Sequence, residues 1–464
     1  MNVEMMPFYH VEEHPSDRVA LIDDRGVCLT YSELAQRVAA FANGLTPRSL
    51  MFIFCRNQIE VVIAYLACLQ KKTVALLLDD GLDDARVQQL IDIYRPAWLW
   101  RAQHEGYQLQ ETGLAGWPVH DDLALLMTTS GSTGSPKLVR LSYQNLQSNA
   151  ASIGSYLALD ESERGLVSLP LNYVYGLSIV NSHLHAGATL LLTAYSVMQR
   201  EFWTFVREKH ATSLPGVPYT WEMLKKLRFM RMDLPHLHTL TQAGGKLSSA
   251  LQLEFAEYAR QNGKRFIVMY GAAEATSRMG WLAPEFAAEL PGSIGKAIPG
   301  GEFILLDEQA LPVKEAGCVG ELVYRGPNVA LGYALCGDDL ARDDDFNGVL
   351  YTGDLAVFDN NGFYSITGRK KRFLKVFGNR VGLDEIESLI KQAFPGIDCA
   401  CDGRDDLICL FLTDASQTGA VKQYICDVSR LHHSAVQIIE LETIPRNESG
   451  KTLYHRLKDY VPHT

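Results

Sequence analysis

Short apolar runs and helical stretches alternate along the first part of the chain. Residues 51–55 and 74–78 are unbroken apolar runs, which is typical of strands covered on both faces. Residues 59–69, between them, predict a helix. A strand, a helix and a second strand in this order predict a βαβ unit, and therefore a parallel sheet.

Polar residues that can cap a helix precede two of the predicted helices. Ser32 is expected to cap a helix whose apolar residues fall on one face. Ser142 is expected to cap a second helix of the same kind. Residues 293–363 differ, because short strands and glycine-rich turns predict a small barrel-like subdomain there.

Composition and charge narrow the class of protein. With 464 residues the chain is too long for one core, so two or more domains are expected. A net charge of −11 argues against non-specific binding of nucleic acid and of anionic membranes. The first residues lack the basic and apolar blocks of a signal peptide, and no apolar run is long enough for a membrane span.

The nine cysteines carry no Cys-x-x-Cys pair. Cys399 and Cys401 have the spacing of one strand face, and we expect both to be buried thiols rather than metal ligands. An odd number of cysteines fits a reducing compartment, so a cytoplasmic location is predicted.

Residues 129–137, with the sequence TSGSTGSPK, carry the first candidate chemistry. Apolar segments on both sides predict a loop between two strands. Glycine lets backbone N–H groups approach a ligand, hydroxyls add donors, and Lys137 adds a positive charge, so the loop suits a polyphosphate. It is not a Walker A loop, because a proline precedes the lysine and a strand follows. A solvated serine- and glycine-rich loop without function is the alternative.

Four further segments occur with this loop in a fixed order: 267–274 (IVMYGAAE), 320–326 (GELVYRG) with 332–333, 351–354 (YTGD), and 444–451 (IPRNESGK). Together the five segments resemble the adenylate-forming superfamily of acyl-CoA synthetases, carrier-domain adenylation enzymes and luciferases. The resemblance covers nearly the whole chain. It implies an α/β fold: residues 1–367 form a large domain of two α/β subdomains and a distorted β-barrel subdomain, 368–372 a hinge, and 373–464 a small mobile α+β domain.

The resemblance assigns the nucleotide site residue by residue. Glu274 would bind Mg²⁺, and Ala273 departs from the usual threonine, which removes one hydroxyl contact. Asp354 and Arg369 would bind the ribose. The phosphate residues would be Thr129, Ser130, Gly131, Ser132, Thr133, Gly134, Lys137 and Arg380. The adenine residues would be Gly245, Lys246, Leu247, Tyr270 and Gly271.

The same resemblance places the acid, the hinge and the catalytic lysine. Lys451 would reach the α-phosphate and the substrate carboxylate, Lys371 would be the hinge, and Gly378 would line the tunnel for the thiol. No aspartate lies near Asn172 to pair with an ammonium, so an α-amino acid is disfavoured and an uncharged acyl or aryl tail is expected. The acyl pocket would comprise Tyr173, as its gate, with Val174, Gly176, Val217, Gly244 and Ala272.

The function implied is that of an ATP- and Mg²⁺-dependent acid–thiol ligase. The carboxylic acid would become an acyl-adenylate with release of pyrophosphate, and the acyl group would then pass to a thiol, most simply CoA. Loading of the phosphopantetheine arm of a carrier protein, or amide formation, are alternative second steps. A P-loop kinase does not fit the loop sequence. An inactive nucleotide sensor is disfavoured because both Glu274 and Lys451 are present.

Overall fold

The computed structural model describes residues 6–128, 137–370, 372–376, 379–429, 431–446 and 452–462. The chain forms two compact units. The first unit comprises Met1–Pro291, Ala297–Glu302 and Arg325–Leu350, and the second comprises Gly292–Lys296, Phe303–Tyr324 and Tyr351–Thr464. No helix of the described residues is long and apolar enough to cross a membrane.

The first unit contains a sheet of seven strands in the order β18-β8-β7-β4-β3-β5-β6. The strands are β3 (Leu50–Cys55), β4 (Val74–Asp79), β5 (Trp98–Gln103), β6 (Gly106–Glu111), β7 (Leu123–Thr128), β8 (Leu138–Ser142) and β18 (Gly332–Ala334). β3 and β4 are parallel, as the βαβ pattern predicts, and the helix between them is buried along most of its length. The apolar runs on either side of residues 129–137 are the antiparallel strands β7 and β8.

A second sheet of the first unit has the strand order β14-β13-β12-β11-β9-β10-β1-β2. Its strands are β1 (Val19–Asp23), β2 (Cys28–Thr30), β9 (Arg164–Val167), β10 (Thr189–Leu192), β11 (Ser213–Gly216), β12 (Thr239–Gln242), β13 (Arg265–Tyr270) and β14 (Gly280–Leu282). All neighbours from β1 through β10, β9, β11 and β12 to β13 are parallel. The antiparallel strands β14 and β2 lie at the two ends of this run.

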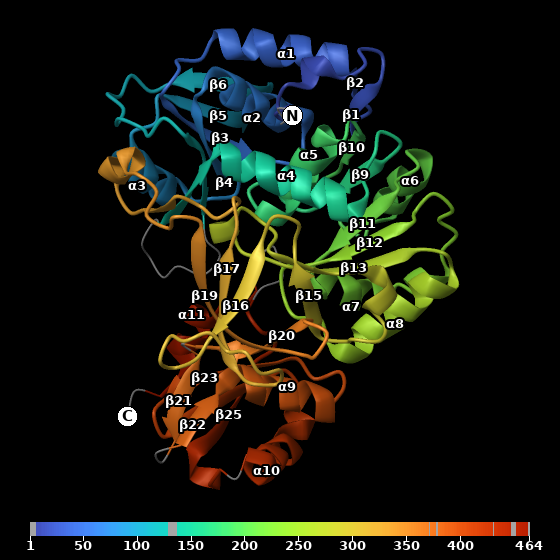
Figure 1. Ribbon diagram of the computed structural model, residues 1–464, viewed down its shortest axis with the longest axis vertical. Helices are drawn as coiled ribbons and strands as arrows, with labels where there is room; N and C mark the ends of the chain where they lie inside the picture. The colour runs from blue at the N-terminus through green and yellow to red at the C-terminus, as the bar shows by residue number, and fades with distance from the viewer. Residues whose placement is uncertain are drawn as a thin grey trace. The chain divides into compact units, whose positions relative to one another are not determined.

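Helices cover both faces of this second sheet. The helices of the first unit are α1 (Tyr31–Asn43), α2 (Ile59–Lys71), α3 (Asp84–Tyr94), α4 (Tyr143–Leu157), α5 (Val174–His185), α6 (Arg200–Glu208), α7 (Pro218–Lys226) and α8 (Ser249–Gln261). Helices α7 and α8 lie against β11, β12 and β13 (Figure 1). Trp221 of α7 packs on Gly216 and on Phe266 of β13, whereas α5 contacts β9 and β10 and packs on α4. The α/β fold with a parallel sheet expected from the sequence is therefore present.

The two predicted helix caps give different outcomes. Helix α4 begins after Ser142, whose hydroxyl accepts a hydrogen bond from Asn145 N at 3.0 Å, so this prediction is confirmed. Helix α1 begins one residue before Ser32, and its N-cap is Thr30, so that prediction is wrong. Thr30 is the N-cap because Glu33, three residues later, completes a capping box with it. In this motif the Thr30 hydroxyl accepts a hydrogen bond from the backbone N–H of Glu33, and the Glu33 carboxylate accepts one from the backbone N–H of Thr30.

The second unit contains β-sheet and a compact α+β part. Its strands and helices are β15 (Ser293–Ala297), β16 (Glu302–Leu306), β17 (Gly320–Arg325), β19 (Val349–Phe358), β20 (Tyr364–Arg369), β21 (Phe373–Val376), β22 (Asn379–Gly382), β23 (Cys399–Arg404), β24 (Leu407–Leu412), β25 (Val436–Glu440), α9 (Leu383–Ala393), α10 (Thr418–Ser429) and α11 (Tyr454–Leu457). The strands of the expected barrel have the open order β16-β17-β19-β20-β15 in the described residues, not a closed ring.

The strands β23, β24 and β25 form a small separate sheet in the second unit. Its core includes Cys399 and Cys401 on β23, which are 2% and 0% exposed, together with apolar residues of α9 and α10. All nine cysteines of the chain are free thiols. The prediction that these two are buried thiols is confirmed.

Candidate active site

Three predicted pocket residues follow the carboxyl ends of neighbouring parallel strands. Val217 follows β11, Gly244 follows β12 and Ala272 follows β13. Because parallel strands end at one edge of a sheet, ligands of open α/β sheets bind outside that edge. The predicted adenine segments 245–247 and 270–271 belong to the same strand ends, so acid and adenine positions share one edge.

Tyr173 and Val217 both lie close to Gly244. A Cβ placed on Gly244 would lie 2.5 Å from Tyr173 Oη and 3.0 Å from Val217 Cγ1, and the φ of Gly244 is +85°. Only glycine therefore permits this approach. Burial raises the pKa of Tyr173 to about 12, so the ring carries a neutral hydroxyl at physiological pH. The residue predicted to gate the acid pocket thus lies against that pocket's predicted wall.

The two other predicted pocket residues, Val174 and Gly176, lie in the first turn of α5. Val174 is half-buried, whereas Gly176 is buried. A Cβ on Gly176 would lie 2.3 Å from Pro170 O and 2.7 Å from Leu169 O. Glycine at this position lets the helix start directly against the preceding backbone, which sets the position of Tyr173.

The loop after β12 is fixed at both of its ends. Gln242 is buried, and its Nε2 donates to Gly245 O at 2.8 Å. Leu247 is buried, and Ser248 caps α8. Lys246, between these fixed points, is exposed. The loop therefore presents its backbone in a defined position, which is what a flat purine ring requires of an adjacent wall.

The turn after β13 leaves no room for a side chain at Gly271. A Cβ there would lie 1.6 Å from Ser277 O. Thr276 has a φ of +64°, which is unusual for a residue other than glycine, and its hydroxyl donates to Asn328 O at 2.7 Å. These close contacts hold the short helical turn that carries Glu274.

Glu274 is hydrogen-bonded to a residue that the sequence reasoning did not assign to the site. Tyr333 Oη donates to Glu274 Oε1 at 2.9 Å. Lys137 Nζ lies 3.3 Å from the centroid of the Tyr333 ring, a cation–π contact. Burial, the charge of Glu274 and this hydrogen bond together raise the pKa of Tyr333. We call Lys137, Glu274 and Tyr333 the rim cluster: one cation, one anion and one neutral hydroxyl.

Strand pairing explains why Tyr333 reaches Lys137. Strand β18 pairs antiparallel with β8, and Tyr333 lies opposite Val139, two residues after Lys137. Gly332 has a φ of +127°, and a Cβ there would lie 2.8 Å from Asp345 Oδ2. Glycine is therefore required for the chain to enter β18 beside this carboxylate.

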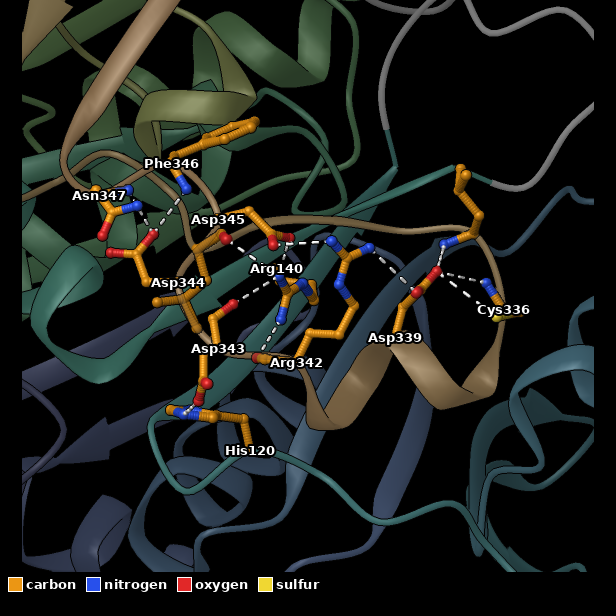
Figure 2. A network of polar contacts seen from close by, with 12 residues as sticks. His120, Arg140, Cys336, Asp339, Arg342, Asp343, Asp344, Asp345, Phe346 and Asn347 are labelled. Carbon is orange, nitrogen blue, oxygen red and sulfur yellow. Dashed lines mark hydrogen bonds and ion pairs between the residues drawn. The ribbon is translucent and has the colours of Figure 1, made fainter.

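Arg140 anchors the loop that follows β18 (Figure 2). Its side chain is fully buried, and Nη2 donates to Asp345 Oδ2 at 2.7 Å and to Asp343 O at 3.0 Å. Nη1 donates to Arg342 O at 2.5 Å. A buried guanidinium that binds one carboxylate and several carbonyls holds the loop rigidly. Arg140 thereby sets the register of β18 and the place of Tyr333.

The two predicted ribose residues are paired with each other in the second unit. Asp354 and Arg369 are cross-strand partners on β19 and β20, and Arg369 Nε lies 3.0 Å from Asp354 Oδ1. Asp354 is 7% exposed, and its backbone N–H donates to Thr352 Oγ1 at 3.1 Å. Arg369 is largely exposed. A buried acceptor with an exposed cation beside it suits a polar ligand that carries hydroxyls.

The residues on either side of the predicted hinge are held by different partners. Lys370 Nζ lies 2.6 Å from Glu321 Oε2, on β17. Arg372 Nη2 donates to Glu387 Oε1 at 2.9 Å, and its guanidinium lies 3.8 Å from the Tyr454 ring centroid. One neighbour of the hinge is thus tied to the β17 sheet, and the other to α9 and α11.

Several predicted site residues lie outside the described residues. The side chain of Arg380 is also outside them, although its backbone belongs to β22. The residues concerned are Thr129, Ser130, Gly131, Ser132, Thr133, Gly134, Lys371, Gly378 and Lys451.

Arg278 is the second residue that the sequence reasoning missed. It is 3% exposed and lines a cavity of about 20 Å³ beneath α4 and α5. Pro215, Thr241 and Met269 of β11, β12 and β13 line the same cavity. We call it the Arg278 cavity. Its strands are those whose carboxyl ends carry the predicted acid pocket.

The donor set at the rim cluster is compatible with magnesium. Among the described residues, no group of three or more His, Cys, Asp or Glu side chains could hold a metal ion. Mg²⁺ in nucleotide sites is usually held by one or two carboxylates together with phosphates and waters. Glu274 supplies one carboxylate beside the predicted phosphate loop, so these residues fit an ion that arrives with a nucleotide.

The fold is that of an α/β enzyme, and the predicted acid and adenine residues follow the carboxyl ends of its parallel strands. The family model for the AMP-binding enzyme matches residues 8–104 and 94–334, and the chain belongs to this family. It is an acyl-CoA synthetase-like ligase of the adenylate-forming superfamily, as the resemblance implied.

Three relatives illustrate the similarity. The 2-succinylbenzoate–CoA ligase of Bacillus subtilis (strain 168) is 28% identical over 476 residues, which cover 96% of this chain and 95% of the relative. The long-chain-fatty-acid–CoA ligase of Escherichia coli O157:H7 is 30% identical over 377 residues, which cover 77% of this chain and 65% of the relative. The structure of o-succinylbenzoate coenzyme A synthetase from Bacillus subtilis, in complex with ATP and magnesium ion, is 23% identical with a TM-score of 0.80, and the match covers 98% of this chain and 100% of that one.

Proposed function

We propose that the protein activates a carboxylic acid with ATP to form an acyl-adenylate and pyrophosphate, and then transfers the acyl group to CoA. The observation that carries this proposal is the rim cluster. It places a carboxylate, a lysine amino group and a hydroxyl together at the end of a parallel strand, next to the predicted phosphate loop. The curated relatives are acid–CoA ligases, which supports the same reaction.

The first half-reaction joins two anions, so the protein must mainly neutralise charge and align the reactants. The carboxylate oxygen of the acid attacks the α-phosphorus of ATP, and the bond to the bridging oxygen of pyrophosphate breaks. Lys137 offers a positive charge where the pyrophosphate would leave. Magnesium bound at Glu274 would offset further phosphate charge. Lys451 would neutralise the charge that builds on the α-phosphate.

The second half-reaction requires a thiol to reach the adenylate. The thiolate sulfur attacks the acyl carbon, and AMP leaves with the electrons of the mixed-anhydride bond. The proposed rotation of residues 373–464 about Lys371 would withdraw Lys451 and present Gly378. The separate anchoring of Lys370 and Arg372 supports a pivot between them.

The ribose and adenine assignments belong to the same proposal. Asp354 would accept hydrogen bonds from the two ribose hydroxyls, with Arg369 beside it, and Tyr270 would lie over the adenine. A buried carboxylate is well suited to a diol because it accepts hydrogen bonds and donates none. A cytoplasmic location, supported by the free thiols, is also proposed.

A carrier protein instead of CoA is the second candidate for the thiol. Both present the same phosphopantetheine thiol, so the predicted tunnel does not distinguish them. The two relatives named above act on different acids, as their names state, and they leave the acid open as well.

The test is a panel of carboxylic acids with ATP and Mg²⁺, read by pyrophosphate release and by mass spectrometry of the products. CoA and a phosphopantetheinylated carrier protein are supplied in turn. We expect acyl-adenylate without a thiol and acyl-CoA with CoA. Pyrophosphate release with no thioester on either acceptor would contradict the proposed second step, and no release with any acid would contradict the whole proposal.

A further inference from the structure

Arg278 is held rigidly in the interior of the first unit. It lies in the turn between β13 and β14, four residues after Glu274. Its carbonyl accepts hydrogen bonds from two buried amides, Asn149 Nδ2 at 3.1 Å and Asn328 Nδ2 at 2.9 Å. These two hydrogen bonds fix the backbone of Arg278, and therefore the position from which its side chain extends.

The guanidinium of Arg278 contacts uncharged groups: a thioether sulfur, a hydroxyl and an aromatic ring. Nε lies 3.3 Å from Met269 Sδ, and Nη1 donates to Ser277 Oγ at 3.0 Å. The guanidinium carbon lies 4.0 Å from the centroid of the Tyr175 ring. Within the part of the chain that the structure describes, Arg278 forms no ion pair with a carboxylate, unlike the buried Arg140.

The nearby tyrosines do not supply the missing negative charge. The Tyr175 hydroxyl is already bonded to Thr241, at 2.7 Å from the carbonyl oxygen. Burial raises the pKa values of Tyr156 and Tyr173 to about 12, although the charge of Arg278 opposes this rise. Both phenols are therefore neutral at physiological pH. A buried cation without an anion is costly, and it is normally kept only where a partner binds it.

The position of the charge connects it to the acid site. The Tyr175 ring, on which Arg278 lies, is 6.4 Å from the ring of Tyr173 between centroids. Tyr173 in turn contacts Gly244 at the predicted acid pocket. The Arg278 cavity is therefore lined by the same three strands whose carboxyl ends carry the predicted acid pocket.

The cavity also contains a second unused polar atom. His183 is buried, its Nδ1 lies 2.9 Å from Ile179 O, and its Nε2 has no hydrogen-bond partner among the described residues. Burial lowers the pKa of His183, so the ring is neutral. A cavity of about 20 Å³ has room for a water or a small terminal group, and not for a long alkyl chain.

We propose that the Arg278 cavity receives a second anionic group of the substrate, so that the preferred acid is a compact dicarboxylic acid whose distal carboxylate pairs with Arg278. This inference rests on the proposed ligase function and names its substrate class. It replaces the uncharged tail that the sequence alone suggested. Arg278 acts as a specificity residue, and the Tyr175 ring lies between its guanidinium and Tyr173 of the predicted acid pocket.

The experiment compares matched acids that differ only at the distal end. Straight-chain dicarboxylic acids from malonate to suberate are each paired with the monocarboxylic acid of the same carbon number, and benzenedicarboxylates with the matching toluates. Pyrophosphate release gives kcat/KM for each acid with the wild type, Arg278→Met and Arg278→Lys. Arg101→Met is the matched control, because Arg101 also lies over an aromatic ring, Phe54, outside the cavity.

We expect the wild type to prefer one dicarboxylic acid over its partner by at least about 100-fold, because a buried polar site rejects analogues that leave it unpaired. Arg278→Met should abolish this preference with the KM for ATP unchanged. Arg278→Lys should retain part of it, and Arg101→Met all of it. Without substrate, Arg278→Met should be at least as stable to heat as the wild type, since replacing an unpaired buried charge by an apolar group is not destabilising.

A second measurement does not depend on catalysis. The same dicarboxylic acid should raise the thermal midpoint of the wild type and leave that of Arg278→Met unchanged. If monocarboxylic acids release pyrophosphate while no dicarboxylic acid is preferred, the inference is wrong and the proposed function stands. If Arg278→Met loses stability together with activity toward both series, Arg278 is structural and the inference is again wrong. If no acid releases pyrophosphate, the ligase function fails, and the thermal shift decides whether Arg278 binds carboxylates.

Discussion

The rim cluster and the Arg278 cavity are built in opposite ways. At the rim, Lys137 directly precedes β8 and Glu274 lies in the short helical turn after β13, and both belong to short segments that can be recognised in the sequence. The cavity takes one to three side chains from each of several helices and strands, and no short sequence motif indicates it. We infer that short sequence segments specify the nucleotide chemistry of this protein. Its choice of acid is instead specified by the packing of residues that are far apart in the sequence.

This contrast predicts two separable sets of mutants. Changes at the nucleotide side should affect every acid alike, because all acids use the same adenylation step. Changes at the acid side should alter the choice of acid with nucleotide binding unaffected.

Lys451→Ala should have the largest effect. Loss of one charge-stabilising group at the transition state is expected to lower the rate of adenylate formation roughly 10²- to 10³-fold. Thioester formation from supplied acyl-adenylate should be spared, because the proposed rotation withdraws this lysine. Pyrophosphate release and single-turnover thioester formation measure the two steps. Lys458→Ala, at an exposed lysine nearby, is the control. An equal loss in both steps would contradict the two-conformation scheme.

Asp354→Ala should weaken ATP binding for every acid. The ribose hydroxyls would lose their acceptor, and unsatisfied polar groups cost about 1–3 kcal/mol, or roughly 5- to 150-fold in Kd. Asp354→Asn keeps an acceptor oxygen and should lose less. Calorimetry with ATP measures both. If Asp354→Ala bound ATP with unchanged affinity, the assignment of Asp354 to the ribose would be wrong.

The sequence predicted the fold and the rim better than the cavity, for physical reasons. The close contact at Gly271 depends on residues near it in the chain, so a short motif contains it. Tyr333 was missed because its partner Glu274 lies 59 residues away in the sequence, and because the strand pairing that brings Tyr333 to Lys137 is also long-range. A tyrosine directly after Gly332 was the only available signal.

The assignment of Arg278 required the structure for another reason. Its sequence neighbourhood, Thr276-Ser277-Arg278-Met279, carries no sign of burial, and a lone arginine is usually a surface residue. Burial by α4 and α5 decides its role. The wrong helix cap predicted at Ser32 also reflects neighbouring residues. Thr30 and Ser32 can both cap a helix, and the capping box with Glu33 places the cap at Thr30.

Gly244→Ala should change the acid side alone. The added Cβ would lie 2.5 Å from Tyr173 Oη, so the ring must move. Overpacking of this kind costs about 1–3 kcal/mol, and we expect kcat/KM for the acid to fall roughly tenfold with the KM for ATP unchanged. Gly263→Ala is the matched control, because Gly263 also has a positive φ, +62°, and a Cβ there would meet nothing within 4 Å. A rise in the KM for ATP would show that acid and nucleotide sides are not separable here.

Tyr333→Phe should have the smallest effect and separates the two contacts within the rim cluster. Phenylalanine keeps the ring beneath Lys137 and removes only the hydroxyl that donates to Glu274 at 2.9 Å. A hydrogen bond of this kind contributes about 1 kcal/mol, so we expect roughly a fivefold rise in the KM for MgATP, equal for every acid. Tyr333→Leu removes the cation–π contact as well and should weaken MgATP binding further. Steady-state kinetics at varied Mg²⁺ measure both variants. If Tyr333→Phe instead altered the choice of acid, Tyr333 would contribute to acid binding. A residue of the rim cluster would then help to select the acid, and the separation between the nucleotide site and the acid site would not hold for Tyr333.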